Sequence, residues 1–102
     1  MPRYRLTSNA QFDLIEIRRN TLIQWGSLQS KKYLSELRQA IVLLSNRPTI
    51  GKHRPDIAEG VFSLPHASHV IYYGLDLNQL VVFGILHKRM VPGNHLEGRE
   101  TI

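Results

Sequence analysis

Two helical stripes fill the first half of the chain. Apolar or small residues recur at steps of three and four through residues 10–25 and again through residues 34–44. This spacing places side chains on one face of a helix. Gly26 separates the stripes, and Pro48 cannot continue a helix. A connection of one or two residues forces two helices into an antiparallel hairpin. The predicted helices cover residues 9–25 and 28–46, with boundaries uncertain by roughly two to four residues.

The other elements with a clear pattern are strands. Tyr4 and Leu6 alternate with polar residues, as in a short edge strand. Residues 76–79 (DLNQ) have the composition of a hairpin turn. Residues 48–60 hold two prolines and two glycines, which predicts an irregular loop over the surface. The strands predicted after this loop cover residues 61–64, 69–75 and 80–87.

The order of these elements predicts an α+β fold, because the helices are grouped together and the later strands follow one another by short turns. An N-terminal strand and an antiparallel helical hairpin are expected to pack on a small antiparallel sheet. The last strand is nearly all apolar and is therefore expected to be central in the sheet. At 102 residues, we expect one domain spanning residues 1–102.

Composition narrows the chemistry. The chain has no cysteine, which excludes disulfides, thiol nucleophiles and cysteine-based zinc sites. The hydrophobic share of 42% suits a packed globular protein, and no segment reaches the apolar length of a membrane span. No apolar stretch follows the first residues, so we expect no secretory signal and a cytoplasmic location. Dinucleotide, P-loop and hydrolase motifs are missing, and no cofactor is expected.

Charge is distributed unevenly along the chain. Residues 1–51 hold eight Lys or Arg and three Asp or Glu, a net of +5, whereas residues 52–102 hold five of each, a net of zero. Such asymmetry fits a surface for an acidic partner, either protein or nucleic acid, or an ordinary solvated helical face. The solvated face is the commoner case, and it is favoured here because these cations alternate with apolar residues and form no block. The cations expected on the hairpin include Arg18, Arg19, Lys31 and Lys32.

The end of the last predicted strand carries the main candidate site. His87, Lys88, Arg89 and Met90 follow directly from a core strand, and we refer to these four residues as the rim. His95 and Leu96 lie beyond it in a tail that is at most a short helix. A rigid strand that ends in charge and exposed apolar surface has the composition of a contact surface with a few anchors. Arg89 is the expected anchor, because its planar guanidinium binds carboxylate or phosphate in two places.

Two kinds of chemistry compete with binding at this end of the strand. His66, His69 and His87 are three imidazoles that could approach one another, but no carboxylate lies near His66 and His69 in sequence, and a metal site is not favoured. A ribonuclease would need a base, an acid and a cation in one cleft. Those residue types are present, but the sequence does not show whether they lie in one cleft. The candidates are His87, Lys88, Arg89 and one of Tyr72 and Tyr73. Trp25 is expected to anchor the hairpin core.

Residues in a fixed order carry a resemblance to a known family. In the first half they are Leu6, Thr7, Ala10, Asp13, Leu14, Ile17, Thr21, Trp25, Gly26, Gln29, Tyr33 and Leu37. In the second half they are Pro48, Gly51, Arg54, Ile57, Gly60, His69, Ile71, Tyr73, Ile85, Leu86, His87, Arg89, Met90, His95 and Leu96. This set, above all WGxxQ at residues 25–29 with ILHxRM at residues 85–90, resembles the ParE toxins of the RelE/ParE superfamily of bacterial type II toxin-antitoxin systems.

The resemblance implies an α+β toxin that is held inactive by a ParD-like antitoxin. ParE members are generally described as poisons of DNA gyrase, so gyrase is the expected target, bound by protein contacts and without direct sequence-specific recognition of nucleic acid. We expect the rim, His95 and Leu96 to bind the target, and the basic hairpin to bind an acidic antitoxin segment. The protein is then not an enzyme.

RelE-type relatives instead cut mRNA on the ribosome, and this activity is the alternative. A third possibility is a member that only binds its antitoxin. Many relatives carry an arginine three residues before the histidine of the last strand, where this chain has Gly84, and this difference weakens the nuclease hypothesis. Val91, Pro92 and Gly93 also stand where relatives often begin a C-terminal helix with an acidic residue.

Overall fold

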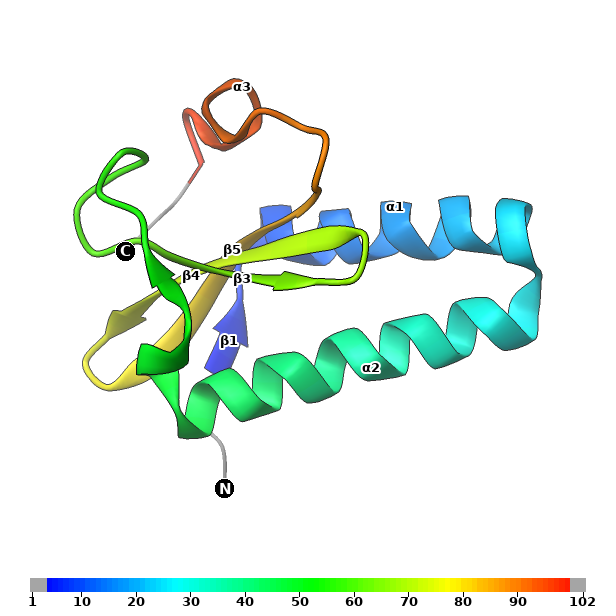
Figure 1. Cartoon of the computed structure of the whole chain (residues 1–102), viewed down its shortest axis with the longest axis horizontal. Coiled ribbons are helices and arrows are strands. Elements are labelled where there is room, and N and C mark those ends of the chain that lie inside the picture. Colours follow the sequence, from blue (N-terminus) through cyan, green and yellow to red (C-terminus); the bar gives the residue numbers. More distant parts are fainter. Residues whose placement is uncertain (1–3, 100–102) are drawn as a thin grey trace.

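A helical hairpin lies against one face of a five-stranded sheet in the computed structural model, which describes residues 4–99 (Figure 1). The strand order is β1-β5-β4-β3-β2. A third, short helix lies over the opposite face of the sheet. The elements are β1 (Tyr4–Leu6), α1 (Ser8–Trp25), α2 (Ser27–Asn46), the 3-10 helix η1 (Pro48–Ile50), β2 (Lys52–His53), β3 (Phe62–His66), β4 (His69–Asp76), β5 (Gln79–His87) and α3 (Pro92–Leu96).

The helical hairpin begins and turns at residues that the sequence marks. Thr7 caps α1, since its hydroxyl oxygen accepts the backbone N–H of Ala10 at 3.2 Å. Gly26 alone joins α1 to α2 and has φ +86° and ψ 171°. Glycine is the residue that adopts this conformation without strain. The two predicted helices are confirmed, and Figure 1 shows their turn projecting beyond the sheet.

The sheet is mixed, which corrects the expectation of an antiparallel sheet. β3, β4 and β5 pair antiparallel as predicted, whereas β1 runs parallel to β5, with Tyr4 opposite Leu80 and Leu6 opposite Val82. Three alternating residues indicate an edge strand but contain no information on its direction. β5 was predicted to be central, and it does have neighbours on both sides, although β4 holds the middle position of the five strands.

Tight connections fix the register of the later strands. Leu77 and Asn78 form the turn between β4 and β5 with φ of +49° and +68°, the conformation of a two-residue hairpin. The segment predicted as an irregular loop contains η1 and the two-residue strand β2, which pairs with β3. The Tyr73 hydroxyl holds η1 to the sheet, because it donates to Pro48 O at 2.6 Å and accepts the N–H of Gly51 at 3.1 Å.

A β-bulge divides β5. Tyr73 pairs with Val82 and Tyr72 pairs with Gly84, so Phe83 is the extra residue of β5. The bulge therefore places Phe83 and Gly84 on the same face of the sheet. That face packs on α3, whereas Val82 and Ile85 belong to the cluster under α1 and α2. The second cluster contains Val61, Tyr72, Phe83, Leu86 and Leu96.

Candidate functional site

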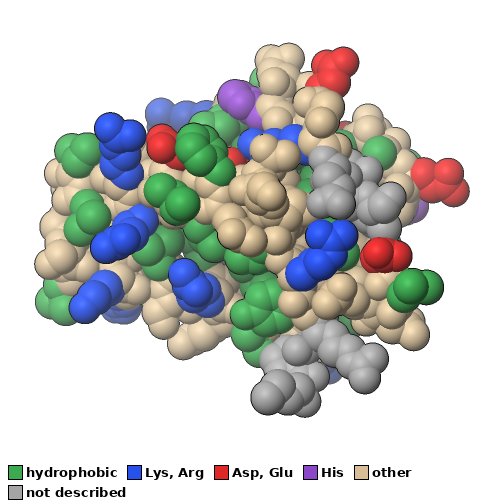
Figure 2. All heavy atoms as spheres, turned by 180° about the vertical axis from the view of Figure 1, so that it is seen from behind, with side chains coloured by type: hydrophobic (Ala, Val, Ile, Leu, Met, Phe, Trp, Pro, Cys, Tyr) green, Lys and Arg blue, Asp and Glu red, His purple; other side chains and the backbone are tan. Residues whose placement is uncertain are grey.

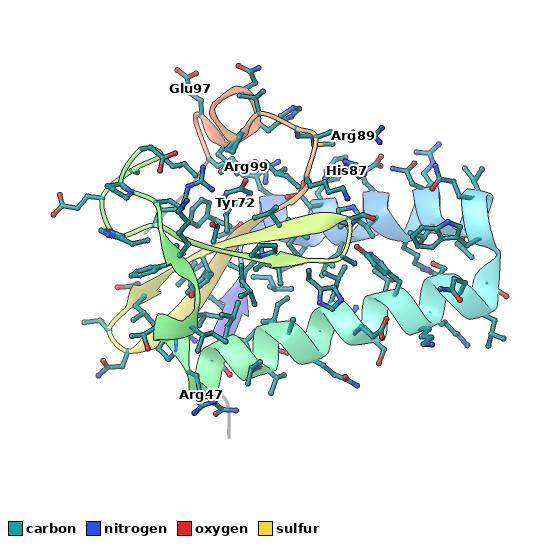
Figure 3. All side chains as sticks on the ribbon, in the orientation of Figure 1. Arg47, Tyr72, His87, Arg89, Glu97 and Arg99 are labelled. Carbon is teal, nitrogen blue, oxygen red and sulfur yellow. The ribbon has the colours of Figure 1, made fainter. Side chains whose placement is uncertain are left out.

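The rim lies where β5 ends. His87 is half-buried, whereas Lys88, Arg89 and Met90 are exposed. Hydrogen bonds define the turn that follows the strand: Met90 N donates to His87 O at 2.9 Å, and Arg89 N donates to His87 Nδ1 at 3.1 Å. The second bond requires an unprotonated Nδ1, so the neutral ring carries its proton on Nε2. Figure 3 shows the side chain of Arg89 pointing away from the fold.

The two predicted site residues beyond the rim have different surroundings. His95 is exposed on α3. Leu96 is 4% exposed and packs in the second core cluster, so the expectation that it contacts a target is wrong. The short helix turns its one buried residue toward the sheet, and the sequence pattern of a five-residue helix cannot show which side that is. Leu96 is therefore an anchor of the C-terminal segment.

A buried tyrosine–histidine pair adjoins the rim. The Tyr33 hydroxyl lies 2.6 Å from His69 Nδ1, and the rings of His69 and His87 meet edge-on with centroids 5.4 Å apart. Burial, with smaller effects from His87 and His66, lowers the pKa of His69 from 6.5 to about 4. Burial also raises the pKa of Tyr33. Near neutral pH, the hydrogen bond therefore joins a protonated Tyr33 hydroxyl to a neutral His69 ring.

Little of His69 is open to a metal ion or a substrate, because its Nδ1 is engaged by Tyr33 and the residue is buried. Within residues 4–99, no three His, Asp or Glu side chains are grouped to hold a metal ion. Tyr73 packs on the helical face of the sheet and pairs with Val82 of β5. Val82 precedes His87 by five residues, which is a distance of roughly 16 Å along the strand. Tyr72 lies under Arg54, whose guanidinium carbon is 5.9 Å from the ring centroid. Of the nuclease candidates, the two tyrosines are thus not placed beside His87.

A groove of about 470 Å³ connects the rim to α1. His69, His87 and Met90 line one side of it. The other side is formed by α1 residues, which include Glu16, Asn20, Gln24 and Trp25. Trp25 is 44% exposed and meets the Tyr33 ring edge-on with centroids 5.4 Å apart, so it borders this groove and is not the predicted core anchor.

The hairpin carries basic and apolar side chains together. Arg18 and Arg19 on α1 and Lys31 and Lys32 on α2 are all exposed, as predicted. Figure 2 shows Lys and Arg interspersed with hydrophobic side chains over this half of the molecule. The exposed apolar residues of the two helices are Phe12, Ile15, Leu22, Ile23, Trp25, Leu28 and Leu43. Exposed apolar surface next to charge is typical of a protein-binding face.

Asp13 and Arg99 form an ion pair that sequence analysis missed. Arg99 Nη1 donates to Asp13 Oδ2 at 2.6 Å, and Arg99 Nη2 donates to Asp13 Oδ1 at 3.1 Å. Both side chains are largely buried, with 10% of Asp13 and 15% of Arg99 exposed. A signal was present, because Asp13 interrupts the apolar stripe of α1 at a core position, and a buried carboxylate requires a partner.

Neither long helix within residues 4–99 is apolar enough to cross a bilayer. The fold, with its strand, helical hairpin and meander of strands, is the RelE/ParE-like α+β fold that the sequence predicted. Residues 4–92 match the family described as ParE toxin of type II toxin-antitoxin system, parDE, and the chain belongs to this family.

Known relatives agree with this assignment. Toxin ParE1 of Caulobacter vibrioides is 28% identical over 96 residues, which cover 94% of this chain and 99% of that protein. A solved structure, described as the chromosomal ParDE TA system from P. aeruginosa, superposes with a TM-score of 0.74 at 18% identity. The superposition covers 85% of this chain and 96% of that one, and it shows a shared fold.

Proposed function

We propose that this toxin acts by binding, that its target is DNA gyrase, and that the rim makes the contact. The observation that carries the proposal is the rim itself, where Lys88, Arg89 and Met90 are exposed at the end of an interior strand. A guanidinium and a flexible apolar side chain fixed to a rigid strand suit a protein surface. The expected consequence is a trapped gyrase–DNA complex and arrested replication in the cytoplasm.

Two features favour binding over cleavage of mRNA. His69 is buried, neutral near pH 7 and hydrogen-bonded to Tyr33, so it supplies no imidazolium as a general acid beside His87. Gly84 takes the strand position at which many relatives carry an arginine, and Leu96 and Arg99 occupy the space above it. The guanidinium of Arg99 is engaged by the Asp13 carboxylate, so that position of the sheet offers no unpaired cation for a phosphate.

The partner that neutralises the toxin is, in this proposal, a ParD-like antitoxin with an acidic segment. The hairpin offers the cations Arg18, Arg19, Lys31 and Lys32 beside exposed apolar residues. A disordered acidic segment that folds on this face as an amphipathic helix would cover both kinds of surface. The groove of Trp25 and His87 leads from this face to the rim.

Induction of the toxin without its antitoxin tests the proposed target. Poisoned gyrase should produce filamentous cells with DNA damage signals while protein synthesis continues. The matched control is the Arg89→Ala variant, which should allow normal growth. Immediate arrest of translation in the wild type would contradict the proposal and indicate cleavage of mRNA on the ribosome.

A further inference from the structure

The edge of β5 that faces β1 changes partner halfway along the strand. Its pairing with β1 ends at Leu6 and Val82, and Thr7 N then donates to Val82 O at 3.0 Å. Further along this edge, side chains instead of a neighbouring strand form the hydrogen bonds to the backbone of β5. Asp13 Oδ2 accepts the N–H of Ile85 at 3.0 Å, and Arg99 Nη1 donates to Phe83 O at 3.1 Å.

Arg99 thus binds two elements at once. Its guanidinium donates to the Asp13 carboxylate on α1 and to the Phe83 carbonyl on β5. Lysine cannot reproduce this planar fork. Figure 3 shows Arg99 reaching from the C-terminal segment toward the sheet beside Tyr72.

Gly84 makes room for the same segment. The bulge turns Gly84 toward α3, and a Cβ at this position would lie 2.5 Å from Leu96 Cδ2 and 3.4 Å from Arg99 Nη1. Leu96 fills this space and is 4% exposed. Asp13, Gly84, Leu96 and Arg99 together form what we call the clasp.

The clasp closes the loop that carries the rim. Residues 88–95 leave the sheet at His87 and return to it at Leu96 and Arg99. At the start of the loop, Lys88 N donates to Ser68 O at 2.9 Å. The backbone bonds of Met90 and Asn94 are short-range turns, such as Asn94 N to Val91 O at 3.0 Å. The conformation of Met90 and His95 therefore depends on the two ends of the loop. A loop whose ends are both fixed has fewer conformations to lose when it binds a partner.

We propose that Asp13 is a positioning residue for the toxic surface: through Arg99 it fixes the C-terminal segment on the sheet and so holds the rim in its binding conformation. The inference rests on the proposed role of the rim in binding the target, whatever that target is. Asp13 is too buried to be a principal contact itself. Its effect on toxicity should be indirect.

Asp13→Asn is the informative change. An amide oxygen in the place of Oδ2 can still accept the N–H of Ile85 and one N–H of Arg99 Nη1. The negative charge is lost, and the amide N–H₂ group in the place of Oδ1 faces Arg99 Nη2 with donors against donors. The hold on Arg99 should be weakened while the edge of β5 keeps its bond. Hydrogen exchange of the amides of Met90, Asn94 and Arg99 should rise about tenfold, the change expected for losing one charge-assisted hydrogen bond. Amides of α2 should exchange at the wild-type rate.

The matched control is Asp56→Asn. Arg54 Nε and Nη2 donate to Asp56 at 3.1 and 3.0 Å, which is also a two-pronged pair, but the Asp56 side chain is 62% exposed. An exposed pair of this kind contributes little to stability. Both variants should bind antitoxin like the wild type. Asp13→Asn should need about tenfold more toxin to arrest growth, in proportion to the lost order of the loop.

Three results decide the inference. Unchanged exchange at Met90, Asn94 and Arg99 in Asp13→Asn would overturn it, and so would faster exchange with full toxicity. A toxic Met90→Ala variant beside a non-toxic Asp13→Asn variant would contradict the proposed rim and still support Asp13 as a positioning residue for another part of the same segment.

Gly84→Ala provides a second, independent variant in case Asp13→Asn reduces folding. The added methyl group displaces Leu96 and leaves the charges of Asp13 and Arg99 unchanged. Faster exchange confined to residues 88–99, with weaker toxicity and intact antitoxin binding, would support the inference. Wild-type exchange and toxicity in this variant would overturn it.

Discussion

His69 is the residue at which the hairpin, the sheet and the rim meet. The residue is 9% exposed, and its ring is hydrogen-bonded to Tyr33 of α2 and meets the ring of His87 edge-on. Burial opposes the charged form of this ring more than either neighbouring histidine does. The residue is therefore a neutral structural group near neutral pH, and the fold should depend on its neutrality.

The lowered pKa of His69 predicts a loss of stability in acid. Between its ordinary value of 6.5 and its folded value of about 4, the unfolded chain binds a proton that the folded chain does not. Stability therefore falls as pH decreases through this window, by about 2 kcal/mol between pH 7 and pH 5. Urea unfolding at both pH values measures the loss.

The control separates His69 from the other histidines. His69→Gln should flatten most of this pH dependence, whereas His53→Gln, which changes an exposed ring on β2, should preserve it. An equally steep pH dependence in the His69→Gln variant would show that other groups cause the acid sensitivity.

Single residues were the hardest features to derive from the sequence. The exposed rim and the four exposed hairpin cations were placed correctly, because charged residues at a strand end or on a helix face stay in water. Leu96 and Trp25 were misplaced, since the exposure of an apolar residue near the end of an element depends on what packs above it. Arg99 stands in a tail without periodicity, so nothing in the sequence joined it to Asp13.

At the scale of elements, the turn of the hairpin depends on one residue. Gly26 has φ +86° and ψ 171°, and no heavy atom lies within 4 Å of a Cβ built on it, so the cost of a side chain there comes from the backbone alone. Gly26→Ala should lower the free energy of unfolding by about 1–3 kcal/mol. Thermal or urea unfolding measures the change.

Gly93→Ala is the matched control for this prediction. Gly93 lies in α3, where a Cβ also meets nothing within 4 Å, and its φ is not positive. The free energy of unfolding should stay within about 0.5 kcal/mol of the wild type or rise slightly, since alanine favours a helix. Equal losses in the two variants would mean that the backbone of Gly26 is not the reason for the effect.

Elements with strong periodicity were predictable, and short ones were not. Both long helices, the β4–β5 turn and the interior position of β5 follow from repeated patterns or specific turn residues. The direction of β1 depends on where the hairpin returns the chain, which is a tertiary property. β2 has two residues and no period, and its pairing with β3 is favoured by the Tyr73 bonds that hold the preceding η1 segment.

The whole molecule carries its excess positive charge in the hairpin half. The net charge is +5, and the cations Arg18, Arg19, Lys31 and Lys32 are exposed. Long-range attraction should speed the association of an acidic antitoxin segment. The association rate constant should fall by about tenfold when salt is raised from 10 to about 150 mM, because the screening length shortens from roughly 30 to 8 Å.

Stopped-flow or surface-binding kinetics can check this prediction. The Lys31→Gln, Lys32→Gln double variant should associate more slowly at low salt and show a weaker salt dependence than the wild type. An association rate that does not change with salt would remove electrostatic steering from the account and leave the apolar surface as the main attraction.

The central claim is that the toxin binds gyrase through the rim and does not cut RNA. The most direct measurement compares the purified wild type with Arg89→Ala and Arg89→Lys in a gyrase supercoiling assay and on ribosome-bound mRNA, with antitoxin binding confirming that each variant folds. We predict that the wild type inhibits supercoiling, that both variants inhibit it at least about tenfold less, because neither replaces the guanidinium fork, and that mRNA stays intact. Specific cleavage of mRNA that disappears in His87→Ala, with supercoiling unaffected, would contradict the account.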